Sequence, residues 1–118
     1  MDIVIFQEEN ILEESLSSFQ DLLFSSQMKY LSSDLLNEGL SPLEIRRAVK
    51  KAMTICQTSK IKLRQHFLPV YTQVNGILMN DCKLSQLGYG LVLLNADVNN
   101  PNAAQWQIKV MKYYLENI

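Results

Sequence analysis

The sequence contains few of the residues from which most catalytic and metal sites are built. It has one histidine, His66, and two cysteines, Cys56 and Cys82, in 118 residues. A histidine-assisted nucleophile would have to use His66, and no nucleophile motif surrounds it. A structural zinc ion needs four ligands, and these three residues do not supply them. We therefore expect no catalytic residue, no metal site, no cofactor and no small-molecule substrate.

Long apolar runs and a basic leader pattern are also absent. No apolar stretch approaches the ~20 residues that cross a bilayer, and the start of the chain turns acidic at Glu8 without a preceding basic region. With no paired cysteine motif, this pattern predicts a cytoplasmic protein outside the membrane. A hydrophobic content of 47% and a charged content of 19% are those of a folded protein, so we expect a single domain over residues 1–118.

Positive charge is nearly missing from the first third of the chain and is concentrated in the second. Residues 1–38 hold eight acids and one base (net −7), whereas residues 39–66 hold seven bases and one acid (net +6). This division predicts either a site for a polyanion or two segments that attract each other within the fold. The bases of the second segment are the candidate nucleic-acid-binding residues: Arg46, Arg47, Lys50, Lys51, Lys60, Lys62 and Arg64.

Most of these bases belong to an amphipathic helix predicted within residues 40–64. Ser41 is a suitable N-cap, Glu44 completes a capping box, and Pro42 suits the first helical position. An apolar stripe follows at helical spacing, opposite the bases: Ile45, Val49, Ala52 and Cys56. A brief helix over Ser32 to Glu38, ended by Gly39, precedes it, so the pair predicts a helix-turn-helix.

A β-hairpin is expected directly after this helix pair. Two β-prone runs, Val70 to Val74 and Ile77 to Met79, flank Asn75-Gly76, the pair that best fits a two-residue type I′ turn. Pro69 is expected to interrupt the segment before the hairpin. A helix-turn-helix followed by a hairpin is typical of a winged-helix domain, so residues 39–80 are predicted to form a winged-helix-like centre.

The flanking segments complete a mostly helical α+β domain. Before the centre, the acidic part of the chain predicts short strands at Ile3–Phe6 and Met28–Leu31 and a helix from Asn10 to Phe24. After it, residues 81–118 predict a buried helix from Lys83 to Asp97 and a final helix from Ala103 to Asn117. Because the final helix is apolar on nearly every side, it is expected in the core or against a protein partner or second copy. Its candidate interface residues are Trp106, Val110, Tyr113 and Tyr114.

Three short motifs are spread over residues 30–111: Tyr30-Leu-Ser-Ser-Asp-Leu35, a run from Lys51-Ala52 to His66-Phe67, and a run from Lys83-Leu84-Ser85 to Gln107. Together they resemble the DNA-damage-inducible protein D family, and the first also resembles phage antirepressors with a BRO-type domain. The family's motif of Lys-Leu-Ser-Arg, Asn-Ala-Asp-Pro and a later Gln is similar to Lys83-Leu84-Ser85-Gln86, Asn95-Ala96-Asp97, Pro101 and Gln107. Its Lys-Ala, Cys, Ser and His-Phe positions are similar to Lys51, Ala52, Cys56, Ser59, His66 and Phe67. The chain departs from the family at Ser32-Ser33, Gln86, Val98 and Lys109-Val110.

The resemblance and the basic helix together favour a non-enzymatic DNA-binding or DNA-associated regulator. Its cationic side chains would neutralise phosphates. The alternative is a small interaction or dimerising protein that acts through its C-terminal aromatic helix, with the basic helix docked on the acidic N-terminal part. The aromatic residues Tyr71 and Tyr89 could stack on bases or serve only in packing.

Overall fold

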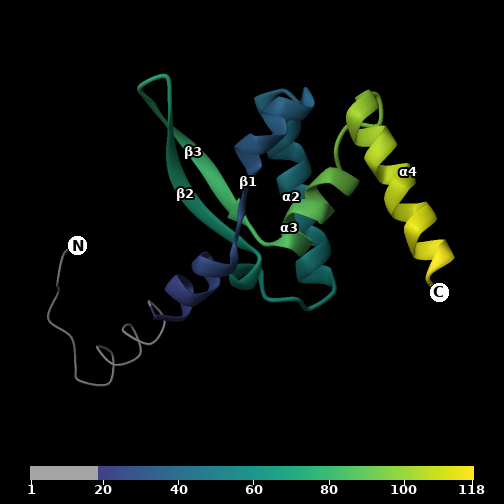
Figure 1. Cartoon of the computed structure of the whole chain (residues 1–118). Coiled ribbons are helices and arrows are strands. Elements are labelled where there is room, and N and C mark those ends of the chain that lie inside the picture. The colour runs from purple at the N-terminus through teal and green to yellow at the C-terminus, as the bar shows by residue number, and fades with distance from the viewer. Residues whose placement is uncertain (1–18) are drawn as a thin grey trace, which may run out of the picture.

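The computed structural model describes residues 19–118 and shows the expected α+β fold, mostly helical with one small sheet (Figure 1). The predicted strand Ile3–Phe6 and the first part of the predicted helix from Asn10 lie outside these residues. Residues 19–27 are helical. The elements that follow are β1 (Tyr30–Leu31), the 3-10 helix η1 (Ser32–Glu38), α2 (Pro42–Thr58), the 3-10 helix η2 (Leu63–Gln65), β2 (Phe67–Val74), β3 (Ile77–Leu84), α3 (Gln86–Leu94) and α4 (Pro101–Glu116).

The turn between η1 and α2 follows the local sequence signals closely. Gly39 ends η1 with a left-handed φ of 85°, and its N–H donates to the carbonyl of Leu36. Ser41 then caps α2, because its hydroxyl oxygen accepts from the Glu44 N–H at 3.2 Å. The hydroxyl also donates to the Glu44 carboxylate, so the two side chains bond to each other. The predicted helix pair is confirmed, with a 3-10 helix as its first member.

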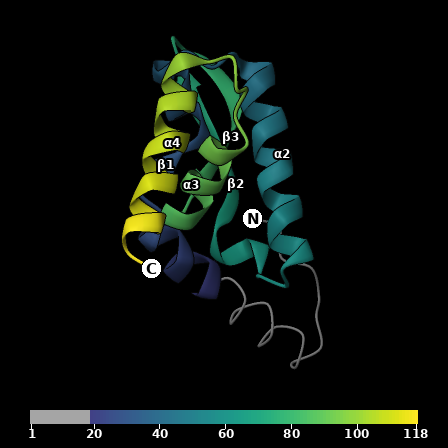
Figure 2. The ribbon, with the colours of Figure 1, turned by 90° about the vertical axis from the view of Figure 1, so that its right-hand side faces the viewer.

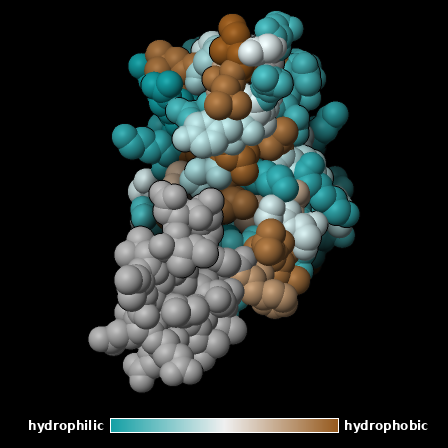
Figure 3. Space-filling view, turned by 90° about the vertical axis from the view of Figure 1, so that its left-hand side faces the viewer, coloured by the Kyte–Doolittle hydropathy of each residue, from teal (hydrophilic) through white to brown (hydrophobic). Residues whose placement is uncertain are grey.

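The hairpin is confirmed and is longer than predicted. Asn75 and Gly76 have φ values of 53° and 81°, as a type I′ turn requires, and the two strands pair from Val74↔Ile77 to Phe67↔Leu84. Pro69 lies inside β2 and does not interrupt it, because β2 is an edge strand whose outer side needs no amide donor. The hairpin extends along one side of the molecule, where apolar side chains reach the surface (Figure 3).

The sheet order is β1-β3-β2, so the short first strand pairs with the second hairpin strand. β1 is only two residues long, shorter than the predicted strand from Met28 to Leu31, and it pairs through Tyr30↔Leu84 and Leu31↔Lys83. The succession of helix, short strand, helix, helix and hairpin gives the chain the winged-helix-like centre expected from the sequence.

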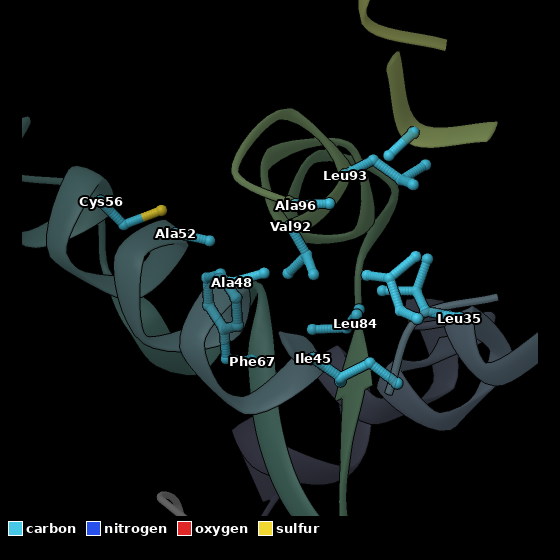
Figure 4. Packing of buried hydrophobic residues seen from close by; sticks show 12 residues of the cluster. Leu35, Ile45, Ala48, Ala52, Cys56, Phe67, Leu84, Val92, Leu93 and Ala96 are labelled. Atoms are coloured by element: carbon cyan, nitrogen blue, oxygen red, sulfur yellow. The ribbon is translucent and has the colours of Figure 1, made fainter. Parts of the chain in front are cut away.

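The core lies where α2 and α3 meet the base of the sheet (Figure 4). Side chains from α2 point toward Val92 of α3 and toward the sheet residues Phe67 and Leu84. Leu84 and Val92 are fully buried, as is Leu35 of η1. The predicted stripe of α2 is confirmed at Ile45, Ala52 and Cys56; Val49 is half-buried, and Ala48 takes the more central position.

α3 begins later than the sequence pattern predicts, because Lys83 and Leu84 belong to β3 and Ser85 is the N-cap. The Ser85 hydroxyl accepts from the Gly88 N–H and bonds the His66 ring at 2.7 Å. A Cβ on Gly88 would lie 2.7 Å from the His66 carbonyl oxygen, closer than such contacts occur. Gly88 therefore allows the start of β2 to approach α3.

α4 contradicts the first of its two expected environments, burial in the core; the second, contact with a partner or second copy, stays a prediction. Asn100 caps it and Pro101 takes the first position, as predicted. Only its first turns are covered by the body, where Ala103 is buried and Trp106 is half-buried. Val110 is also half-buried, but Tyr113 and Tyr114 are 69% and 63% exposed. Figure 2 shows α4 and α2 on opposite sides of the molecule. Within residues 19–118, no helix has both the length and the apolar character needed to cross a membrane.

Candidate nucleic-acid interface

Four cations occupy the outward side of α2. Arg46, Arg47, Lys50 and Lys51, which we call the cationic face, are all exposed, opposite the buried residues of the same helix. In residues 19–118 none of the four forms an ion pair, since the one salt bridge there joins Arg64 to Asp21. The cationic face is therefore solvated within the described part of the chain and open to an anionic ligand.

The arrangement of these four charges does not favour helix stability. Arg46 and Lys50, and likewise Arg47 and Lys51, are like-charged neighbours at i and i+4, which costs a few tenths of a kcal/mol per pair. The helix dipole would favour cations in the last turn, but α2 has none there. Stability does not explain why the charges are placed here, so their placement calls for a ligand or another role.

A groove separates η1 and the first half of α2 from the middle of β3. Its volume is about 560 Å³, and Arg46 of the cationic face lies on its wall. The remaining lining residues come from η1, α2 and β3: Ser32, Ser33, Leu36, Pro42, Ile45, Val49, Met79, Asn80, Asp81 and Cys82. One residue of the cationic face, Arg46, thus lies across the groove from the hairpin strand β3. No sequence pattern predicted this groove, because its two walls, α2 with η1 and β3, lie at least 30 residues apart in the chain.

Asp81 holds the hairpin against η1. One carboxylate oxygen accepts from the Ser32 hydroxyl at 2.7 Å and from the N–H groups of Ser33 and Cys82, and the other accepts from the Thr72 hydroxyl. Burial alone would raise the pKa of Asp81, but the hydrogen bonds outweigh burial and lower it. The carboxylate therefore stays ionised and fixes three elements. No local sequence pattern around Asp81 predicts this role, because two of its hydrogen-bond donors, Ser32 and Ser33, are 49 and 48 residues away in the chain.

The other predicted cations lie beyond the C-terminal end of α2. Lys60 lies two residues after the end of α2, with a φ of 61°, and both Lys60 and Lys62 are exposed. Arg64 forms an ion pair with Asp21, with 2.7 Å between Nη2 and Oδ1. The structure therefore places these three residues apart from the cationic face, and Arg64 is engaged within the fold.

The two candidate stacking residues have different surroundings. Tyr71 lies on β2 and is 71% exposed. Tyr89 of α3 stacks on Tyr30, with ring centroids 4.5 Å apart, and is half-buried. Burial, with smaller contributions from Glu38, Asp34 and Tyr30, raises the pKa of Tyr89. Tyr71 is therefore placed to meet a ligand, whereas Tyr89 serves packing.

The few residues that could perform chemistry are occupied structurally. His66 bonds Ser85, and the fully buried Cys56 belongs to the core. Burial is the largest cause that raises the pKa of Cys82 to about 11, so its thiolate is scarce at neutral pH. Residues 19–118 contain no group of three His, Cys, Asp or Glu side chains that could hold a metal ion.

Comparisons with protein-family models, with curated proteins and with solved structures return no match.

Proposed function

We propose that this protein is a non-enzymatic, DNA-associated regulator that contacts DNA through α2 and the hairpin. The observation that carries the proposal is the cationic face. Four exposed cations lie on the second helix of a helix-turn-helix, beside a hairpin, in an arrangement that weakens the helix itself. Contact with phosphates would replace the repulsion by attraction and release counterions.

Each part of the surface has a distinct role in this proposal. Arg46, Arg47, Lys50 and Lys51 neutralise phosphates, and Lys60 and Lys62 extend the positive potential past the end of α2. The exposed Tyr71 offers an aromatic ring to the ligand, and it pairs across the hairpin with Asn80 of β3, which lines the groove. These phosphate contacts would position the protein on DNA. They carry no sequence information, which would have to come from contacts with the bases.

We also propose kinship to the damage-inducible protein D family and to phage antirepressors, on the residue pattern described above. Several residues of the shared pattern have fold-determining contacts. Ser85 caps α3 and binds His66, and the Gln107 amide donates to the Leu93 carbonyl at the end of α3. Where the family has Ala-Arg, Ser32 and Ser33 bind Asp81. We therefore propose that the resemblance reflects residues that maintain the fold, whereas the proposed DNA contacts rest on α2.

A charge-reversal experiment tests the proposal. In the double variant Arg47→Glu/Lys50→Glu, we expect duplex binding to weaken by at least about 100-fold, since two contacts are lost and two repulsions are added. The melting temperature should hardly change, because exposed charges contribute at most about 1 kcal/mol each.

The matched control is Lys109→Glu/Lys112→Glu, which makes the same change of charge on the exposed polar side of α4, across the molecule from α2. Its affinity should remain within about threefold of that of the unmodified protein, apart from the general effect of net charge. Equal losses in both double variants would show that binding depends on net charge alone and would overturn the role of α2.

A protein-interaction role without nucleic acid is the second candidate, and the exposed end of α4 favours it. In this role the surface of Trp106, Val110, Tyr113 and Tyr114 binds a protein partner, and the bases of residues 39–66 pair with acids of the N-terminal part. The Arg64–Asp21 pair is one contact of that kind. If the unmodified protein fails to bind duplex or single-stranded DNA at low salt, this role replaces the first.

A further inference from the structure

Apolar residues along α4, and one just beyond its end, are regularly spaced. The half-buried Ala104 and the exposed Ile108, Met111 and Leu115 lie on the helix, and Ile118 lies two residues after its last residue, Glu116. These five residues, which we call the seam, follow one another at spacings of four, three, four and three. This alternation of three and four is the spacing of a coiled coil, in which two helices pack along each other by knobs-into-holes packing. The last four are 58%, 54%, 59% and 83% exposed, so no other part of residues 19–118 covers them.

The seam is a different surface from the one by which α4 packs on the body. Trp106 and Gln107 face α3: the Trp106 ring lies beside Gly90, and the Gln107 amide donates to carbonyls at the end of α3. On a helical projection the seam lies roughly 100° further round the helix than Ala103, the residue buried against the body. Docking α4 on α3 therefore leaves the seam open along the length of the helix.

We propose that the seam binds the seam of a second copy of this chain, in a symmetric antiparallel helix pair centred on Met111. No charged residue lies in the seam, so an identical face meets no like charge. In the antiparallel orientation the small Ala104 faces the large Ile118 of the second copy at both ends, which keeps the helix axes evenly spaced. A parallel pair would place two small residues at one end and two large residues at the other.

The area is sufficient for a dimer. With Tyr114 at its edge, 63% exposed, the seam presents about 400 Å² of apolar surface per chain, taking roughly 60–120 Å² for each aliphatic side chain and 150–250 Å² for the aromatic one. At about 65% apolar area, a pair would bury about 1,200 Å² in total, the lower bound for specific interfaces. The proposal is independent of DNA binding.

Sedimentation equilibrium from 5 to 200 µM tests the proposal, with variants at two positions of α4. The unmodified chain of 13.6 kDa should sediment as a dimer at the upper concentrations. Met111→Asp should raise the dimer dissociation constant at least about 100-fold, because a symmetric pair would bury two carboxylates together. Since Met111 is already exposed in one copy, the variant's monomer should retain its circular dichroism spectrum. Lys109→Asp, on the exposed polar side of α4 and off the seam, should leave the dimer intact.

Cysteine crosslinking tests the orientation. Met111→Cys should form a disulfide-linked dimer on mild oxidation, and the native Cys56 and Cys82 supply a low background because one is buried and the other has a pKa of about 11. An Ala104→Cys chain mixed with an Ile118→Cys chain should crosslink, whereas Ile118→Cys alone should not. A monomer at 200 µM, a Met111→Asp dimer, or crosslinking of Ile118→Cys alone would each overturn the proposal.

Discussion

Two glycines of α3 should respond in opposite ways to the same substitution. Replacing a helical glycine by alanine normally stabilises a helix by about 1 kcal/mol. At Gly90 the new methyl would meet the Trp106 ring at 3.6 Å, an ordinary contact, so we expect Gly90→Ala to stabilise the protein by about 0.5–1 kcal/mol. At Gly88 it would lie 2.7 Å from the backbone oxygen of His66, which cannot turn away as a side chain would.

The cost of Gly88→Ala depends on how far the backbone at His66 must move away from α3. The His66 carbonyl also accepts from the Ser85 N–H at 3.0 Å, and the His66 ring bonds the Ser85 hydroxyl, so the clash strains the junction of β2 and α3. Overpacking of this kind costs typically 1–3 kcal/mol. After the propensity gain of about 1 kcal/mol we expect a net loss of about 1 kcal/mol, or roughly 4–8 °C in melting temperature.

Thermal and urea unfolding of both variants measure the difference. The unmodified protein should lie between Gly90→Ala and Gly88→Ala in stability, with the two variants separated by about 2 kcal/mol. If both variants gain or lose the same amount, the close approach of His66 to α3 is wrong.

Three further substitutions test the remaining supports of the fold. Asp81→Asn should destabilise the protein by about 1–2 kcal/mol at pH 7, since it replaces a carboxylate that accepts four hydrogen bonds. Because the pKa of folded Asp81 lies below the ordinary value of 3.8, this deficit should be full above about pH 5 and should shrink as the pH falls through the folded pKa. Gly76→Ala should cost about 1 kcal/mol in urea unfolding, since φ is 81° with open space around it. Trp106→Ala should cost about 2 kcal/mol, roughly half the cost at a fully buried site, and a change below about 0.5 kcal/mol would show that α4 is not anchored there.

The features that the sequence predicted well are governed by neighbouring residues. Ser41 and Glu44 cap α2 because they are three residues apart, and Asn75-Gly76 form the hairpin turn because both tolerate positive φ. Interactions of this range can be read from a short stretch of chain. The predicted helix-turn-helix and hairpin are present for that reason.

The features that the sequence missed depend on distant contacts. The sequence pattern treated Pro69 as an interruption, but whether a strand tolerates proline depends on its place at the edge of the sheet. Asp81 gave no signal because Ser32 and Ser33 reach it only in the folded chain. The apolar character of α4 predicted that it lies in the core or against a partner, because composition does not say whether the surface that covers a helix belongs to the same chain. The exposure of Met111 had to come from the structure.

The salt dependence of DNA binding tests the central claim most directly. If the four residues of the cationic face each neutralise one phosphate, log affinity for a short duplex should fall against log salt with a slope of about −4, at roughly −0.9 per contact. Fluorescence anisotropy with a labelled duplex between 50 and 200 mM salt measures this slope. In the Arg47→Glu/Lys50→Glu variant the slope should become shallower, between about −2 and zero, because two of the four phosphate contacts are lost. A slope near zero, or no binding of the unmodified protein at 50 mM salt, would contradict DNA binding by α2.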